Sequence, residues 1–405
     1  MADKQHIYDL AYKFRKSKIW MRMWENDLFA INLPDDGSGD REQNTGFCSV
    51  MGRNGEHMAI AIYLGPTGFS SYRKLSMGGG EDDLAEVLSQ DSIQCSMAEK
   101  EELTPEELTE VQAYCKTTGT PFRAPFPKFS RIRPYCFPYP FEEEWEWTAM
   151  ETALEVMDRM GKRSLTELGI RSITATPFHE SYEDEAGFGY RGKKTPVRIP
   201  LFSVTDGELK SVPIPLPPYQ EEEPEAPTQL NELAIRKLKN RPQRGIMEAD
   251  VFRVGPPVDG NPPFLPALLI GVTEEGIVLP PAVGKEARYD PNQLIGEFIQ
   301  NLDGLYPKTI RYRTEEAHVL LEEFCRLARI RLEQTDEFEN LDGVVESLKD
   351  GPDDETVDEI LEQLSQMSVE ELRMLPDVIL QAMLHDADYM PPQLAAKIRK
   401  AAGRR

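Results

Sequence analysis

The sequence predicts an α/β protein with mixed sheets, organised as two α/β domains followed by a helical tail. In both halves of the 405-residue chain, short apolar runs that fit strands alternate with apolar residues at helical spacing. A segment rich in Pro and Glu, VPIPLPPYQEEEPEAPTQ, separates the halves and cannot bury a core. We therefore expect an N-terminal domain over 1–204, a linker over 205–228, a C-terminal domain over 229–349 and a helical tail over 350–405.

Composition and charge exclude several classes of protein. No window approaches the roughly 18 consecutive apolar residues of a transmembrane helix, and the N-terminus lacks the apolar core of a signal peptide. We therefore expect a cytoplasmic protein with no membrane partner. The five cysteines show no CxxC spacing, which favours free thiols over disulfides or a zinc site. A net charge of −24 repels nucleic acid, so binding to nucleic acid would require a local basic patch.

The first domain is expected to begin with a charged amphipathic helix within 5–24. The pair Asn54-Gly55 tolerates positive φ and predicts a hairpin between strands at 47–51 and 57–64. Thr104 can cap the helix that follows it, because Pro105 suits the first helical position and Glu107 completes a capping box. The other expected elements are strands at 28–33, 92–97 and 197–204 and helices near 69–75, 83–88 and 142–160.

The segment 120–140, TPFRAPFPKFSRIRPYCFPYP, differs from the rest of this acidic chain and is called the basic ribbon below. It holds four basic residues, six aromatic residues, six prolines and no acid. The prolines oppose a helix or a central strand, so we expect an extended segment on the surface. Arginine forks bind phosphate or carboxylate, and aromatic rings stack on bases. The ribbon is therefore our candidate binding site, with Arg123, Lys128, Phe129, Arg131, Arg133 and Tyr135 as its candidate residues.

The basic ribbon also has a structural interpretation. Its aromatic side chains can fill the core of the first domain, and its arginines can pair with the acidic helix that starts near Glu142. The sequence leaves this alternative open.

The second domain centres on ALLIGVTEEGIVLPP, in which two apolar runs flank a turn at 273–276 and predict a hairpin. A basic helix over 230–244 and a strand at 249–254 precede it. Counted from the hairpin, the expected order is β-β-α-β-α-β-α, which suggests parallel neighbours joined by right-handed crossovers. The later elements are expected at 294–302, 309–313, 317–328, 330–333 and 341–348.

That order resembles the order of ribonuclease H-like folds. Enzymes with this fold place an Asp on the first strand and further acids on the next helix and strand, and these acids bind two divalent ions. If the first strand is 267–272, it carries no carboxylate. Glu297 lies on the next helix and Glu315 follows the next strand, so the Asp that should precede them on the first strand is missing. Glu315, His318 and Glu322 share one helix face, which is half of a metal site and is interpreted as a solvated surface. We therefore assign no catalytic residue, no metal and no cofactor.

Three patterns carry a resemblance to a known class of proteins. They are GFCSVMGRNGEHMAIAIYLG in the first domain, PFRAPFPKFSRIRPYCFPYP after it and PALLIGVTEEGIVLPP in the second domain. The sequence, over most of 15–348, resembles two-domain bacterial hypothetical proteins of unknown function. The resemblance implies two domains and a bacterial host, and it implies no activity.

These observations predict a non-catalytic protein-binding or regulatory protein that contacts another protein through the basic ribbon. The charge is polarised, since 351–372 holds eight acids and the last nine residues hold five bases. The alternative is a nucleic-acid-processing or nucleic-acid-binding protein with a ribonuclease H-like domain.

Overall fold

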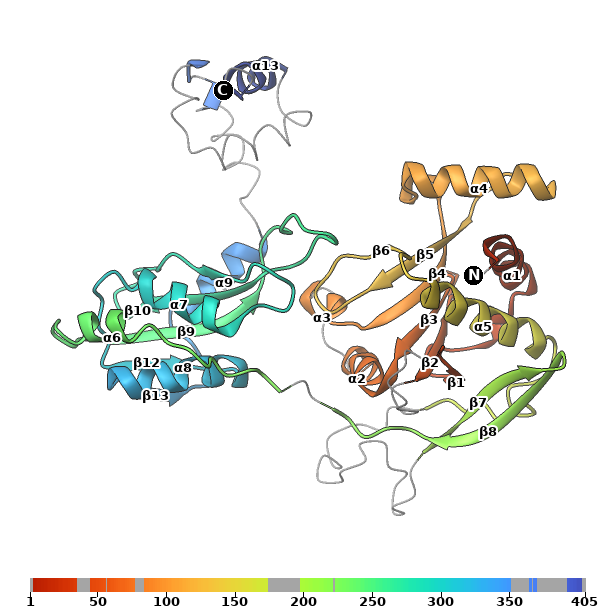
Figure 1. Ribbon diagram of the computed structural model, residues 1–405, viewed down its shortest axis with the longest axis horizontal. Coiled ribbons are helices and arrows are strands. Elements are labelled where there is room, and N and C mark those ends of the chain that lie inside the picture. The colour runs from red at the N-terminus through yellow and green to blue at the C-terminus, as the bar shows by residue number, and fades with distance from the viewer. Residues whose placement is uncertain are drawn as a thin grey trace.

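The computed structural model describes residues 3–34, 44–55, 57–76, 84–173, 197–220, 223–350, 364–365, 367–369 and 392–402. These residues form one sheet of eight strands and one of five, with helices packed on both (Figure 1). The predicted α/β class with mixed sheets is confirmed. No helix among the residues described is long and apolar enough to cross a membrane.

The first sheet is a meander with a parallel addition at one side. Strands β1 to β6 run antiparallel to their chain neighbours, and β7 pairs parallel with β1 on its other side. The sheet order is β6-β5-β4-β3-β2-β1-β7-β8. The strands are β1 (Phe29–Asn32), β2 (Thr45–Met51), β3 (Ala59–Leu64), β4 (Ser92–Ala98), β5 (Phe126–Ile132), β6 (Tyr139–Pro140), β7 (Arg198–Thr205) and β8 (Glu208–Pro215).

Alternating side chains bury both faces of this sheet, as the period of two in a strand requires. One face carries Ile31, Val50 and Ile60 into a core shared with α1 (Lys4–Ser17) and α5 (Glu144–Met160). The other face packs Phe47 and Tyr63 against α2 (Gly65–Ser76). The remaining helical elements are η1 (Ile19–Arg22), α3 (Leu84–Leu88), η2 (Lys100–Glu102) and α4 (Pro105–Thr118).

Local signals in the first domain act as predicted. Gly55 takes φ 85° in the turn between β2 and β3. The Thr104 side chain accepts a hydrogen bond from the Glu107 N–H at 3.2 Å, and the Glu107 carboxylate accepts one from the Thr104 N–H at 2.8 Å. Gly119, at φ 71°, ends α4 in the left-handed conformation that glycine favours. The capping box and the hairpin are confirmed.

The basic ribbon is not confined to the surface, so that expectation was wrong. Its residues 126–132 form β5, which pairs along its whole length with β4 and over two residues with β6. Pro127 has no N–H group to donate toward the β6 side of the strand. This is tolerated because β6 pairs only with Ser130 and Arg131 and does not extend as far as Pro127. Proline therefore limits the length of β6 without preventing β5.

The linker also begins later than expected. Residues 208–215 form β8, which pairs with β7 along its whole length, beginning with Glu208 opposite Thr205. The turn consists of Asp206 and Gly207, with φ 53° and 76°, and Asp-Gly is a strong signal for a two-residue hairpin. β8 is an edge strand, and its prolines suit an edge because they limit pairing with other chains.

The second sheet has the order β11-β10-β9-β12-β13. β9 pairs antiparallel with β10 and parallel with β12, so it is the central and first strand of this sheet. From β10 onward the β-β-α-β-α-β-α order is confirmed, and this order is compatible with the ribonuclease H-like fold considered from the sequence. The elements are α6 (Glu232–Leu238), β9 (Ile246–Arg253), β10 (Ala267–Thr273), β11 (Ala282–Val283), α7 (Pro291–Asn301), β12 (Thr309–Tyr312), α8 (Glu315–Ala328), β13 (Arg331–Gln334) and α9 (Leu341–Asp350).

Helices cover both faces of this sheet. On one face, α7 and α8 meet through Phe298 and Phe324, whose ring centroids lie 6.4 Å apart. On the other face, α9 places Leu341 and Val345 against Ile270. All five cysteines are buried free thiols, as predicted. Of the expected tail, the structure describes α13 (Pro392–Ala402) and a few residues before it, and the rest lies outside the residues described.

Candidate functional site

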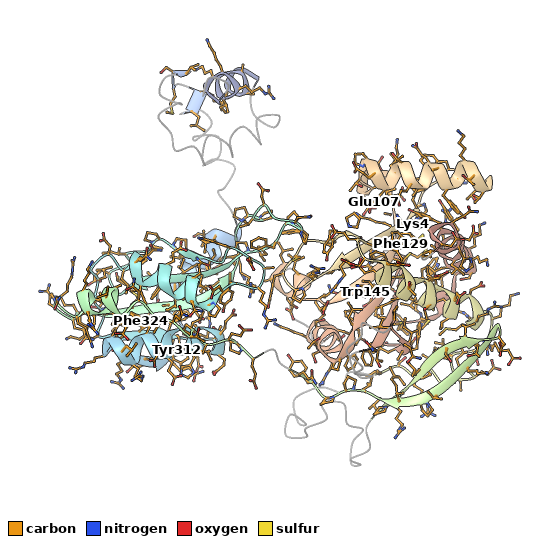
Figure 2. The ribbon with its side chains drawn as sticks, in the orientation of Figure 1. Lys4, Glu107, Phe129, Trp145, Tyr312 and Phe324 are labelled. Atoms are coloured by element: carbon orange, nitrogen blue, oxygen red, sulfur yellow. The ribbon has the colours of Figure 1, made fainter. Side chains whose placement is uncertain are left out.

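The structure distributes the candidate residues of the basic ribbon among three environments. Some lie in the interior, some on the surface and one at a contact with the second domain. Phe129 is a core residue, with ring centroids 5.3 Å from Tyr8 and 5.1 Å from Trp147 (Figure 2). Lys128 donates a hydrogen bond to the Glu102 carbonyl at 2.7 Å.

Arg131 forms a buried charge network and is only 7% exposed. Its Nη2 lies 2.5 Å from Asp91 Oδ1, and its Nη1 donates to the Ser92 carbonyl at 2.9 Å. Its Nε lies 3.7 Å from Oε1 of Glu146, which is 1% exposed. Arg131 therefore joins β5 to α5 and to the start of β4, as the structural interpretation of the ribbon anticipated for its arginines.

Tyr135 lies where the two domains touch. The backbone N–H of Leu265 donates to the Tyr135 carbonyl at 2.8 Å, and the Phe137 N–H donates to the Pro263 carbonyl at 2.9 Å. The guanidinium carbon of Arg253 lies 3.5 Å from the centre of the Tyr135 ring. This contact, formed by 135–137 against 263–265 and Arg253, is called the seam. The protein's own arginine thus covers one face of that ring.

Arg123 and Arg133 are the exposed cations of the ribbon. Arg133 lies over Tyr139, with 5.6 Å from its guanidinium carbon to the ring centre. The backbone around Arg123 is held by α1, because Arg15 Nη1 donates to the carbonyls of Arg123 at 3.2 Å and Pro125 at 2.6 Å. The exposed part of the ribbon is therefore continuous with the C-terminal end of α1.

That continuity defines a surface that we call the α1–η1 rim. The rim combines cations with exposed apolar side chains, and its members are Arg15, Lys16, Lys18, Met21, Trp24, Arg53, Phe122 and Arg123. None of its cations has a carboxylate partner within the described part of the chain. Of the Trp and Phe side chains that the structure describes, only Trp24 and Phe122 are exposed, at 45% and 44%.

Trp24 joins two segments of the rim. The guanidinium carbon of Arg53 lies 3.9 Å from its ring centre, so the β2–β3 turn and the segment after η1 meet here. Met21, three residues before Trp24, is 47% exposed. A pocket of about 80 Å³ opens beside the indole and is lined by Met23, Trp24, Glu25, Val50, Gly52, Arg53, Asn54 and His57.

The buried carboxylates of the second domain lie on β9. The expected assignment of 267–272 as the first strand was wrong, because the first strand of this sheet is β9, which carries Glu248 and Asp250. Asp250 is fully buried and accepts hydrogen bonds from the N–H groups of Arg313 at 2.9 Å and Thr314 at 3.0 Å. It also accepts from the Val251 N–H at 2.8 Å and from the Thr314 hydroxyl. Asp250 therefore holds the start of α8.

Glu248 plays the same part for α9. Its carboxylate accepts hydrogen bonds from the N–H groups of Glu339 at 2.8 Å and of Asn340 and Leu341 at 2.9 Å each. Helix N-termini carry free N–H donors and a partial positive charge, which such a carboxylate satisfies. Among the described residues, no three His, Cys, Asp or Glu side chains are grouped so as to hold a metal ion.

Glu297 and Glu315, the two acids considered from the sequence, each contact a residue of their own helix. Glu297 accepts a hydrogen bond from Gln293 on its own helix at 2.7 Å. The Glu315 side chain is 73% exposed and lies 3.4 Å from His318, which stacks on Tyr312. The signal for the acids of β9 was present in the sequence, because Glu248 and Asp250 stand two apart in an apolar strand and so share one face.

Comparisons with known proteins find one matching family model in each domain. Residues 5–170 match a family described as a domain of unknown function, DUF7309, and residues 234–349 match another, DUF6930. The resemblance to two-domain proteins of unknown function is thus confirmed. No curated protein matches the chain.

Two solved structures are also similar, the catalytic core domain of HTLV-2 integrase with magnesium in its trimeric and dimeric forms. Each is 20% identical, matches 39% of this chain and 82% or 83% of its own, and has a TM-score of 0.21. A likeness at that TM-score supports no statement about activity.

Proposed function

We propose that the protein is a non-catalytic binding protein whose α1–η1 rim docks an acidic surface of another protein. The observation that carries the proposal is the exposed pair of Trp24 and Arg53 beside a pocket, within a row of cations that have no carboxylate partner in the described part of the chain. Trp and Arg are the side chains most enriched among the residues that dominate protein interfaces.

The charge of the rim indicates the chemistry of the partner. Five cations gather here on a chain whose net charge is −24, so an acidic surface would be attracted to the rim and repelled by most of the remaining molecule. Trp24 and Met21 supply the apolar contact that a protein interface needs at its centre. The candidate residue Arg123 belongs to the rim, whereas Arg133 is proposed to contribute only as an exposed cation near the seam.

The acids of the second domain support a non-catalytic role. In a two-metal site, carboxylates must turn toward the ions. Here the two acids of the central strand accept backbone hydrogen bonds at the starts of α8 and α9. Their chemistry in this arrangement is structural.

Affinity purification with quantitative mass spectrometry tests the rim. We expect the double variant Trp24→Ala, Arg53→Glu to lose, by about tenfold or more, proteins that the unaltered chain retains, because truncating central interface residues costs about 2 kcal/mol or more. The control is Leu233→Ala, Arg236→Glu, the same exchange of an exposed apolar residue and an exposed arginine on the second domain. Equal recovery by both variants would overturn the proposed rim.

A nuclease assay with Mg²⁺ or Mn²⁺ tests the alternative. We expect no cleavage of single-stranded or duplex oligonucleotides above the blank. The variants Glu297→Ala and Glu315→Ala serve as the comparison, since neither side chain is buried. Metal-dependent cleavage by the unaltered chain that disappears in these variants would show an enzyme and refute the non-catalytic proposal.

A further inference from the structure

We propose that the second domain carries a separate cationic patch that binds the phosphate backbone of a nucleic acid. The patch consists of exposed cations from three segments, and its members are Lys237, Lys239, Arg241, Arg244, Lys308 and Arg329. It goes beyond the proposed function, because it uses another surface, another ligand and another domain.

Two backbone hydrogen bonds and one from a side chain bring the three segments together. The Arg244 N–H donates to the Tyr306 carbonyl at 2.8 Å, and the Lys308 N–H donates to the Gly245 carbonyl at 3.0 Å. The Gln243 side chain donates to the Arg329 carbonyl at 3.0 Å. The cations after α6 therefore lie next to those that precede β12 and β13. In Figure 1, α6 lies at the end of the second domain away from the first domain.

Arg241 packs against the backbone of Gly304. A Cβ atom placed on Gly304 would overlap Arg241 Nη1, so the guanidinium packs directly on that glycine. Gly304 has φ 88°, a conformation that L side chains rarely adopt. The packing places the exposed guanidinium of Arg241 beside the turn that precedes Lys308.

The patch differs from the other basic surfaces of the domain in lacking counter-charges. Arg311, Arg313 and Arg326 all lie within 4 Å of a carboxylate. The six patch cations form no ion pair with any residue that the structure describes. The acids at its border are Asp303, which is exposed, and Glu274, whose carboxylate accepts a hydrogen bond from the Ile246 N–H at 3.1 Å.

The composition of the patch favours phosphate over a protein partner. Protein interfaces are depleted of Lys and enriched in aromatic side chains, as at the α1–η1 rim. The patch offers six Lys and Arg side chains, and its nearest ring, Tyr306, is only partly exposed and donates its hydroxyl to the Ala328 carbonyl at 2.6 Å. Contacts of Lys and Arg with phosphates need no aromatic centre and read no sequence.

Fluorescence anisotropy with a labelled oligonucleotide, single-stranded or duplex, tests the patch on the full chain. Six phosphate contacts predict a slope of about −5 for log K against log salt on duplex and about −4 on single strands. The variant Lys239→Glu, Arg241→Glu, Arg244→Glu should reduce the slope by about 3 on duplex and weaken binding by about tenfold or more near 100 mM salt.

The matched control reverses three exposed cations of the rim, Lys16, Lys18 and Arg123, and so changes the net charge equally. This control should bind the oligonucleotide as the unaltered chain does. The anisotropy assay therefore tests the cationic patch independently of the affinity purification that tests the α1–η1 rim. No binding by the unaltered chain at low salt, or equal binding by the patch variant, would overturn the inference. So would polyglutamate that displaces the oligonucleotide at equal charge concentration, because the occupant would then be an acidic protein.

Discussion

Replacing Asp250 with alanine is expected to lower the free energy of unfolding of the second domain by about 3 kcal/mol or more. The carboxylate is fully buried and accepts three backbone hydrogen bonds and one from the Thr314 hydroxyl. Alanine leaves these donors without a partner in the interior, and it removes the charge that complements the start of α8. Asp250→Asn, which keeps one acceptor oxygen, should have a smaller effect.

Denaturation by urea measures this loss, with far-UV circular dichroism following both domains. All four tryptophans belong to the first domain, so tryptophan fluorescence reports that domain alone. We expect Asp250→Ala to shift the dichroism transition more than the fluorescence transition. Asp259→Ala, at an exposed aspartate of the same domain, is the control. A variant as stable as this control would contradict the structural role of Asp250.

Replacing Arg131 with alanine is expected to destabilise the first domain by about 3 to 4 kcal/mol. Removing one member of a buried ion pair leaves its partners without compensation, and Glu146 is almost completely buried beside Arg131. The tryptophan fluorescence transition should move to lower urea concentration. Arg133→Ala, at an exposed cation two residues along the chain, should leave it nearly unchanged.

The conservative change Arg131→Lys separates charge from geometry. Lysine keeps the positive charge but cannot reproduce the forked contacts to Asp91 and the Ser92 carbonyl, so we expect a partial loss of stability. If the variants Arg131→Ala and Arg133→Ala were equally stable, the buried network around Arg131 would not stabilise the domain. Reversal of charge at Arg131 would unfold the domain, so binding tests should use Arg123 instead.

Much of the fold could be predicted from local signals. The Asn54-Gly55 turn and the Thr104 cap act within a few residues, and the structure uses both. The Asp206-Gly207 turn is an equally local signal, but the prolines that follow it suggested a linker. Proline excludes a strand interior more strongly than it excludes an edge, and β8 is an edge strand.

The binding surfaces depend on long-range contacts that no local pattern contains. Arg131 meets Asp91, 40 residues away, and that contact decides that this arginine is buried. Likewise, Arg53 reaches Trp24 only because a hairpin turns back toward η1. A sequence marks basic and aromatic residues, whereas their exposure depends on the pairing of strands and helices distant in the chain.

The seam connects the two domains through residues that follow β5 closely in the chain. Only three residues separate Arg131, anchored inside the first domain, from Tyr135, whose ring lies under Arg253 of the central strand β9. The contact between the domains therefore begins within a few residues of the buried Arg131 network. A substitution that disturbs this network is expected to reach Arg253 of the second domain through the short segment from Arg131 to Tyr135.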